Sequence, residues 1–211
     1  MKWRISILIM ISTLLMAFHT YSSTSTAFNL AKIEDKKLIY VFELKTCPYC
    51  KMFNLKTLSD KTVQKILDIN YRLVILYYDE HPEMFYKYVI KGTPTLWFFD
   101  ASGEKPKPIT YLPGFVPPDI FVKVLKYVYK LPKEPFSEYA KKKDDFVGER
   151  KLLEVSKKDA EYVLENDPDS VEAKSMKDFR GEEKVYVTSS EKLAKELLKK
   201  AYRVLLVVKK D

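Results

Sequence analysis

The only two cysteines of this 211-residue chain lie three positions apart, in the stretch KTCPYCKMF at residues 45–53. Cysteine reacts as the thiolate, and its pKa falls at a helix N-terminus, where unpaired backbone N–H groups favour negative charge. Pro48 is suited to the first turn of a helix that would begin beside Cys47. Cys50 would then lie one turn further on, within reach of Cys47. This spacing suits thiol–disulfide exchange, in which Cys47 attacks, a mixed disulfide forms and Cys50 resolves it.

Other uses of the two thiols have less support in the residues present. A structural zinc site needs four nitrogen or sulfur ligands, and beyond the first 27 residues the chain offers Cys47, Cys50 and His81. Copper bound by these same three residues stays an alternative. A purely structural disulfide would close a very short loop and so gain little stability. Redox exchange is the main interpretation, with no metal and no cofactor other than the Cys47–Cys50 disulfide.

The elements around the cysteines alternate between strands and helices. Residues 38–44, LIYVFEL, are rich in β-branched and aromatic side chains and predict a buried strand that leads directly to the cysteines. The resulting order is strand, cysteine-bearing helix, strand, helix, hairpin and helix, which indicates an α/β fold. The later strands are predicted at residues 71–79, 95–99 and 109–112. The later helices are predicted at 81–90 and, after Pro117 and Pro118, at 119–130.

The pattern changes after residues 132–150, a stretch with prolines and a charge run that is predicted to be a linker. Residues 151–211 again alternate strands and helices, which predicts a small C-terminal module of βαβ type with a three-stranded parallel sheet. Its helices are predicted to begin at Ser156, Asp169 and Thr188, where ordinary capping explains the polar residues better than an anion site does. A module of about 60 residues is small for independent stability, so we expect it to pack against something else.

The N-terminus reads MKWRISILIMISTLLMAFHTYSSTSTA, with basic, apolar and then small residues in that order. This order predicts a secretory signal peptide over residues 1–27, a mature protein that begins near Phe28, and a periplasmic location. The apolar run, residues 5–18, is shorter than the ~20 residues that a membrane-spanning helix needs. An uncleaved membrane anchor is the alternative.

The composition fits a folded globular protein: 46% of the residues are hydrophobic and 31% are charged, which excludes a disordered chain. The formal net charge is +8, but the basic residues are scattered along the chain. Because the chain is also expected to be exported, nucleic acid is not an expected partner. A membrane is an expected partner only if the N-terminal segment stays uncleaved.

Three stretches, YVFELKTCPYCKMF, KGTPTLWFFD and YLPGF, together resemble the thioredoxin superfamily over residues 28–131. The resemblance implies a thioredoxin-like fold, with a central mixed sheet flanked by helices. It implies that Pro94 is cis and lies beside the CxxC motif, and that Thr93 offers its backbone to the substrate. Tyr49 lies inside the motif, and we expect it to contact the substrate or to tune the redox potential.

The chain looks most similar to secreted bacterial thioredoxin-like proteins, of the SoxW type and of the catalytic domain of DsbC-type isomerases. CPYC also occurs in glutaredoxins, but the proline segment is GTP rather than TVP followed by paired glycines. Thioredoxins carry a buried aspartate six positions before the first cysteine, where this chain has Val41. Glu43 is the candidate proton relay for Cys50, and the alternative is a half-exposed glutamate at a strand end.

The expected function is that of an exported thiol–disulfide oxidoreductase, which reduces disulfides of other extracytoplasmic proteins through the CPYC dithiol. Its expected partners are protein thiols or disulfides and a membrane electron donor or acceptor. The alternatives are a disulfide isomerase or oxidase, for which residues 146–211 would supply a dimerisation module, and a copper-binding or metal-delivery protein. A further interpretation makes the C-terminal module an interaction domain that directs the redox domain to one client.

Overall fold

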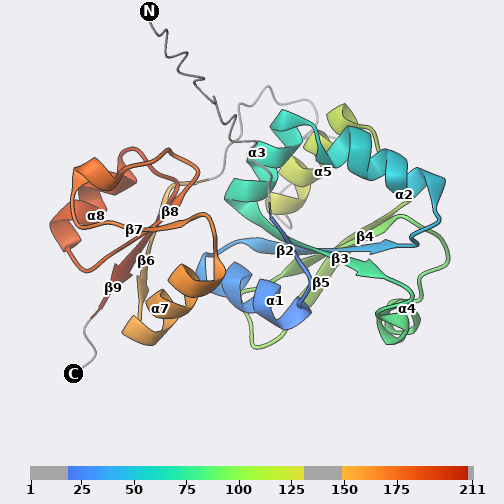
Figure 1. The fold of residues 1–211 in the computed structure, drawn as a ribbon, viewed down its shortest axis with the longest axis horizontal. Helices are drawn as coiled ribbons and strands as arrows, with labels where there is room; N and C mark the ends of the chain where they lie inside the picture. The colour runs from blue at the N-terminus through green and yellow to red at the C-terminus, as the bar shows by residue number, and fades with distance from the viewer. Residues whose placement is uncertain (1–18, 131–148, 209–211) are drawn as a thin grey trace, which may run out of the picture.

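The computed structural model describes residues 19–130 and 149–208, which form two α/β units (Figure 1). The first unit is built on a five-stranded mixed sheet with the order β1-β3-β2-β4-β5. β1, β3 and β2 are parallel, and β4 and β5 follow as an antiparallel hairpin. This is the mixed sheet expected for residues 28–131, with one more edge strand from residues that precede that range. The strands are β1 (Thr20–Tyr21), β2 (Lys37–Glu43), β3 (Tyr71–Tyr77), β4 (Thr95–Asp100) and β5 (Lys107–Pro113).

Helices cover both faces of this sheet, as Figure 1 shows: α2, α3 and α5 lie on one side, and α1 and α4 on the other. Side chains alternate between the faces of a strand, so β2 contributes to two cores. Ile39 and Val41 pack under the first group of helices, and Tyr40 and Phe42 under the second. The helices are α1 (Thr24–Ile33), α2 (Pro48–Met52), α3 (Lys61–Asn70), α4 (Pro82–Lys87) and α5 (Pro118–Lys130), with a π-helical segment, Phe53–Leu58, that continues α2.

The second unit is a parallel sheet of four strands with the order β6-β9-β8-β7. Two helices connect its strands. The cap predicted at Ser156 is confirmed, because its hydroxyl accepts a hydrogen bond from the backbone at the start of α7. α8 begins later than predicted: Thr188 ends β8, and the Ser190 hydroxyl caps the helix. The elements are β6 (Lys151–Val155), α7 (Lys157–Asn166), β7 (Ser170–Glu172), β8 (Val185–Thr188), α8 (Glu191–Leu198) and β9 (Arg203–Val207). The predicted linker falls largely on residues 131–148, outside the described residues.

The prediction of three strands and of a helix at residues 169–172 is wrong, because this segment forms the fourth strand, β7. The side chain of Asp167 accepts a hydrogen bond from the Asp169 N–H at 2.9 Å, and the Ser170 hydroxyl donates to the Asp167 carbonyl at 2.7 Å. Such local side-chain bonds compete with helix formation. They turn the chain after α7, so that Val171 pairs with Tyr186 of β8.

Helix α1 belongs to both cores. Ala27 and Ala31 pack on the first sheet, whereas Leu30 and Ile33, on another side of the helix, pack against α7 and the second sheet. Leu30 is fully buried. The small C-terminal unit therefore buries one face of its sheet against the first unit, as its size led us to expect.

The predicted signal peptide ends inside this fold. Residues 1–18 lie outside the described residues, but Thr20–Tyr21 forms β1 and α1 begins at Thr24. A mature protein that begins at Phe28 would thus begin within α1, next to the fully buried Ala27. Within residues 19–130 and 149–208, the structure has no helix that is both long enough and apolar enough to span a membrane. Export stays a prediction.

A chain that begins at Phe28 is expected to be less stable than one that begins at His19. The shorter chain lacks β1 and the Ser23 cap of α1, and loss of a cap alone costs about 1 kcal/mol. It also lacks the Tyr21 ring, which lies 6.0 Å from the Arg72 guanidinium. We expect the free energy of unfolding in urea to fall by at least about 2 kcal/mol. Equal unfolding midpoints for the two chains would contradict a structural role for residues 19–27.

Candidate active site

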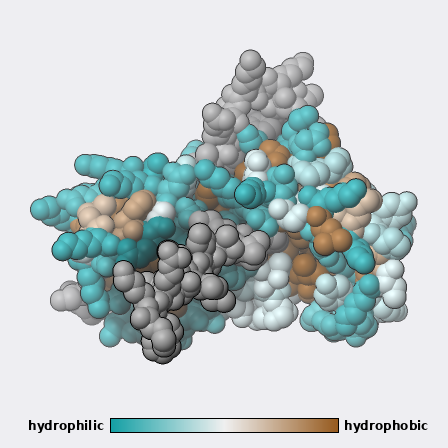
Figure 2. Space-filling model, turned by 45° about the horizontal axis from the view of Figure 1, so that its top comes forward, coloured by the Kyte–Doolittle hydropathy of each residue, from teal (hydrophilic) through white to brown (hydrophobic). Residues whose placement is uncertain are grey.

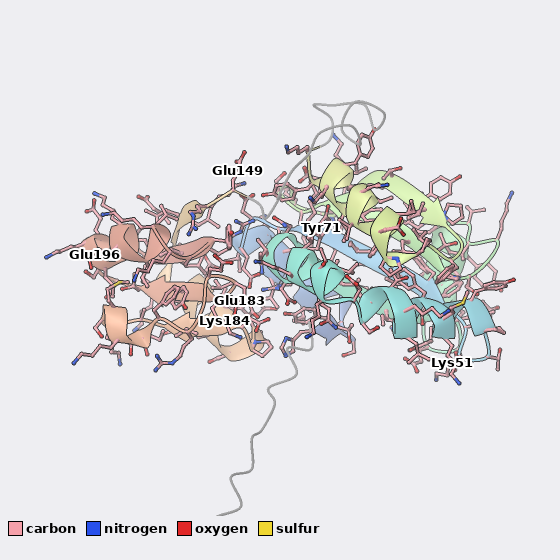
Figure 3. The ribbon with its side chains drawn as sticks, turned by 90° about the horizontal axis from the view of Figure 1, so that it is seen from above. Lys51, Tyr71, Glu149, Glu183, Lys184 and Glu196 are labelled. Carbon is pink, nitrogen blue, oxygen red and sulfur yellow. A yellow bond between two sulfur atoms is a disulfide. The ribbon has the colours of Figure 1, made fainter. Side chains whose placement is uncertain are left out.

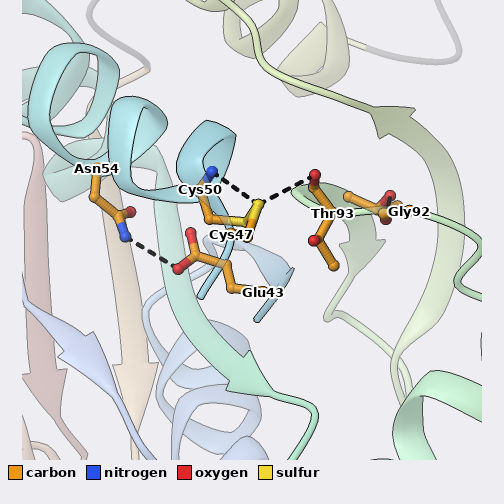
Figure 4. The surroundings of a disulfide bond; sticks show 7 residues. Glu43, Cys47, Cys50, Asn54, Gly92 and Thr93 are labelled. Carbon is orange, nitrogen blue, oxygen red and sulfur yellow. Dashed lines mark hydrogen bonds between the residues drawn. A yellow bond between two sulfur atoms is a disulfide. The ribbon is translucent and has the colours of Figure 1, made fainter. Parts of the chain in front are cut away.

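The two cysteines lie at the predicted junction between a buried strand and a helix, with β2 ending at Glu43 and α2 beginning at Pro48. They form a disulfide, with their Cα atoms 5.3 Å apart (Figure 4). Cys47 is the N-cap of α2, and its Sγ accepts a hydrogen bond from the Cys50 backbone N–H at 3.1 Å. In the reduced protein the same N–H would stabilise a thiolate on Cys47.

The two sulfur atoms differ in their access to solvent. Cys47 is half-buried, whereas Cys50, in the first turn of α2, is only 1% exposed. An attacking or attacked group from another protein can therefore reach Cys47 but not Cys50. This difference fits the roles predicted from the sequence, with Cys47 as the nucleophile and Cys50 as the resolving thiol.

The segment that contains Thr93 and Pro94 lies beside Cys47. The Thr93–Pro94 peptide bond is cis, and the Thr93 carbonyl oxygen lies 3.5 Å from the Cys47 Sγ. Two hydrogen bonds hold the segment: the Thr95 hydroxyl donates to the Gly92 carbonyl at 2.7 Å, and the Gly114 N–H donates to the Pro94 carbonyl at 2.7 Å. The structure thus brings Thr93 and Pro94 to the nucleophile, although their part in substrate docking stays a prediction.

Glu43, the candidate proton relay, is 1% exposed, so its description as a half-exposed strand-end glutamate is wrong. Figure 4 shows its carboxyl group next to the CxxC turn, between the disulfide and Asn54. The Asn54 side-chain amide donates a hydrogen bond to Glu43 at 3.0 Å. Nothing in the sequence analysis pointed to Asn54, which comes from the π-helical segment after α2. Val41, which stands where thioredoxins carry the buried aspartate, lies in the apolar core.

Burial changes the protonation of Glu43. Loss of hydration raises the pKa of its carboxyl to about 7, and the hydrogen bond from Asn54 opposes this rise. The carboxyl therefore gains and loses a proton near neutral pH, where a general acid or base is most effective. A buried carboxyl next to a resolving thiol is suited to take up the proton that this thiol releases.

The CxxC turn exposes both apolar and charged side chains, among them Tyr49 and Lys51. Tyr49 is 61% exposed, and Leu44 and Leu55 are also exposed. In Figure 2 hydrophobic colour gathers mainly over the first unit, and the C-terminal unit is mostly hydrophilic on this face. Lys45, which also precedes the cysteines, binds Asp79 at 2.7 Å and Glu80 at 2.8 Å. Across the described residues, no three metal-ligating side chains come together.

A sequence model of the thioredoxin-like domain matches residues 24–129, half of the chain. The chain belongs to the thioredoxin-like family. Together with the Cys47–Cys50 disulfide, this membership makes it a thiol–disulfide oxidoreductase. The match begins at Thr24, the first residue of α1, and therefore includes residues that the sequence analysis had placed in the signal peptide. The finer likeness to SoxW-type and DsbC-type proteins stays a prediction.

Solved structures of thioredoxin-like proteins each align with about half of the chain. A thioredoxin from Thermus thermophilus is 26% identical, with 53% of this chain and 87% of that chain covered and a TM-score of 0.49. The C-terminal domain of DsbD from Neisseria meningitidis is 22% identical, with 52% and 98% covered and a TM-score of 0.41. A DsbH oxidoreductase is 18% identical, with 55% and 89% covered and a TM-score of 0.44. A comparison with curated protein sequences found no match.

The C-terminal unit lies away from the active site of the thioredoxin-like domain. Figure 3 shows Lys51, the residue after Cys50, at one end of the molecule and Glu196 of α8 at the other. The unit instead packs on α1, so one face of its sheet is covered by its own chain. Its effect on redox chemistry would therefore act through the stability of the domain or through a separate partner.

Proposed function

We propose that this thioredoxin-like protein reduces disulfide bonds of other extracytoplasmic proteins. The observation that carries the proposal is the half-exposed Cys47 sulfur above a buried Cys50, with the Thr93 backbone beside it. This arrangement admits a polypeptide to one sulfur only. The protein substrates, the membrane electron donor and the periplasmic location belong to the proposal.

The reaction takes place in two exchanges. The Cys47 thiolate attacks one sulfur of the client disulfide, which forms a mixed disulfide and releases the first client thiolate. Cys50 then loses its proton and attacks the Cys47 sulfur, which closes the Cys47–Cys50 disulfide and releases the second client thiolate. Two electrons pass from the dithiol to the client. Glu43 takes the proton from Cys50, and a membrane electron donor reduces the disulfide again.

Reduction of the insulin disulfides in the presence of dithiothreitol tests the activity. We expect the protein to accelerate this reduction as a catalyst, over many turnovers. Fractionation of the native cells tests the location, and N-terminal sequencing of the recovered protein would find the first residue of the mature chain. Recovery in the cytosol with residues 1–18 intact would contradict the exported part of the proposal.

Glu43→Gln is expected to slow the resolving step by about a hundredfold, because glutamine cannot accept the proton that Cys50 releases. In the wild-type protein this step should depend on pH with an apparent pKa near 7, the value to which burial raises the Glu43 carboxyl. Decay of a preformed mixed disulfide at Cys47 measures the step directly. Glu83→Gln, on the exposed surface of α4, is the control. An unchanged pH profile in Glu43→Gln would contradict the relay.

The same variant should change how stability depends on pH. Between about pH 4.5 and pH 7 the folded protein keeps a proton on Glu43 that the unfolded chain has lost, so stability falls as pH rises through this range. Glutamine removes this dependence. Relative to the wild type, the oxidised variant should gain up to about 3 kcal/mol between pH 5 and pH 8. If the stability difference between the two proteins were constant from pH 5 to pH 8, ionisation of Glu43 would not destabilise the fold, and this prediction would be wrong.

A further inference from the structure

A groove of about 950 Å³ lies beside the β4–β5 hairpin, on the sheet face that α1 and α4 share. Its floor is aromatic. The rings of Trp97 and Tyr111, a cross-strand pair, stack with centroids 5.2 Å apart, and Tyr88 lies 5.2 Å from Trp97. We call this feature the aromatic groove. Trp97 is only partly buried, whereas its neighbours Phe98 and Phe99 are fully buried.

The groove is open because the helices of this face stop short of the hairpin. α1 packs on β2 and β3, and α4 ends at Lys87, so neither covers the outer part of β4 and β5. Tyr111 of β5 consequently remains 57% exposed. Aromatic side chains left in this way at the surface are frequent anchors for a bound polypeptide.

The charge around the groove has one sign. Lys87, Lys91 and Lys105 line it, and no acidic side chain does so in the described part of the chain. Lys87 places its ammonium group 5.4 Å from the centre of the Tyr88 ring. An occupant that carries carboxylates would complement this rim, whereas a basic one would be repelled.

The groove continues into the active site. Thr93 and Gly114 line it, and the Thr93 carbonyl oxygen is also the atom 3.5 Å from the Cys47 sulfur. In Figure 4, Gly92 and Thr93 lie on the side of Cys47 opposite to Asn54. A polypeptide held on Cys47 by a mixed disulfide would therefore have its neighbouring residues within reach of the groove.

The hairpin limits how such a polypeptide binds. β5 is an edge strand, and an edge strand normally offers free backbone groups to an added strand. Pro106, Pro108 and Pro113 lie in or next to β5, and proline has no N–H to donate. Addition of a strand is thus disfavoured, and recognition must use the aromatic floor and the lysine rim.

We propose that the aromatic groove binds an extended, acidic segment of the client protein, next to the cysteine that Cys47 attacks. The proposal rests on the proposed reduction of protein disulfides and adds the class of client to it. Aromatic or proline side chains of the segment pack on Trp97 and Tyr111, and its carboxylates pair with the lysines. The groove thereby selects clients, while the chemistry stays at the cysteines.

Two peptide disulfides that differ only in charge test the proposal. Each is the disulfide dimer of a short peptide with a single cysteine, next to which stands Glu-Tyr-Glu or Lys-Tyr-Lys. Separate versions place this tripeptide before and after the cysteine. The reduced protein should react with the acidic peptide about tenfold faster at low salt, the effect of about two exposed ion pairs. The double variant Lys91→Glu/Lys105→Glu should bring the ratio of the two rate constants to one or below.

A matched double variant, Lys177→Glu/Lys192→Glu, makes the same change in net charge on the exposed surface of the C-terminal unit and should keep the ratio. The wild type should react faster with the Glu-Tyr-Glu peptide than with a Glu-Gly-Glu version, and Tyr111→Ala should reduce this difference in rate. If the wild type reacts equally fast with the acidic and the basic peptide but reduces hydroxyethyl disulfide normally, the proposed role of the groove is overturned. The proposed function would stay in place. Failure with every disulfide would overturn the proposed function itself.

Binding to vesicles of phosphatidylserine and phosphatidylcholine tests whether the aromatic groove binds an acidic client or a membrane surface. We expect the Lys91→Glu/Lys105→Glu variant to lose its peptide preference, with sedimentation on these vesicles no different from that of the Lys177→Glu/Lys192→Glu control. If instead it loses vesicle binding and keeps the peptide preference, the groove binds lipid, and the proposal is overturned. A peptide preference that persists without any change in vesicle binding would place the acidic segment elsewhere and also overturn it.

Discussion

Cys47→Ser is expected to abolish disulfide reduction, and Cys50→Ser is expected to stop the reaction at the mixed disulfide. Serine does not form an anion near neutral pH, so the first variant should lose at least about a thousandfold in kcat/KM. The second variant keeps the half-exposed sulfur of Cys47 and the Cys50 N–H that stabilises its thiolate. It can attack a client but cannot release it.

The two variants therefore differ in what they accumulate. Incubated with oxidised insulin and separated without reductant, Cys50→Ser should carry an insulin chain on Cys47, and Cys47→Ser should carry none. The reverse result would exchange the roles of the two cysteines and would contradict the assignment from burial, in which Cys50 is 1% exposed. Equal trapping by both variants would show that the turn opens enough to expose Cys50.

Asp167→Ala is expected to destabilise the protein by about 3–5 kcal/mol, the usual consequence of breaking a buried ion pair by removal of one partner. Arg72 of β3 binds Asp167, at the end of α7, and Glu34, at the end of α1. All three residues are at most 3% exposed. Without Asp167, the Arg72 charge would keep only one of its two carboxylates at the contact between the two units.

The same contact lowers the pKa of Asp167. Burial alone would raise this pKa, but the Arg72 charge and a hydrogen bond from Glu34 hold it well below its usual range. A carboxyl with a lowered pKa stabilises the fold above the pKa of the unfolded chain, near 4, and this stability is lost as pH falls below that value. The stability difference between the wild type and Asp167→Ala should therefore shrink in acid.

Glu182→Ala is the matched control for Asp167→Ala. Glu182 also joins the C-terminal unit to the first unit, through an ion pair of 3.1 Å with Lys65. The side chains of both residues are more than 40% exposed. An exposed pair contributes at most about 1 kcal/mol, so the control should unfold in urea close to the wild type. Similar small losses in both variants would contradict the packing of the two units through Arg72.

This buried contact also changes how the C-terminal unit can be tested. Deletion of residues 146–211 would uncover Leu30 and leave Arg72 without Asp167, so lost activity could reflect lost stability. Substitutions on the exposed face of α8 leave that contact intact. They separate an interaction role of the unit from its structural role.

The sequence predicted those parts of the active site that depend on local pattern. A run of β-branched residues, then CPYC with proline in the first helical turn, specifies a strand-to-helix junction, and Cys47 and Cys50 lie there. The segment around Thr93 and Pro94 was located through its resemblance to a family. No local pattern could show that it lies against Cys47, because 46 residues separate the two.

Features that arise from tertiary contacts were missed. The start of α1 was assigned to the signal peptide because its small, hydroxyl-rich residues follow an apolar run. Asn54 and Arg72 gain their importance from partners in other elements. β7 was mistaken for a helix because Asp169 and Ser170 resemble a cap, while its pairing with β8 has no signature in three residues.

The reduction potential of Cys47–Cys50 tests the central claim most directly. The protein would be equilibrated in redox buffers of known potential, and the free thiols would be alkylated and counted by mass. We expect a two-electron couple near about −270 mV, the value of thioredoxin, as a reductase of protein disulfides requires. A value near about −120 mV, that of DsbA, would make the protein an oxidase and contradict the proposed direction of electron flow.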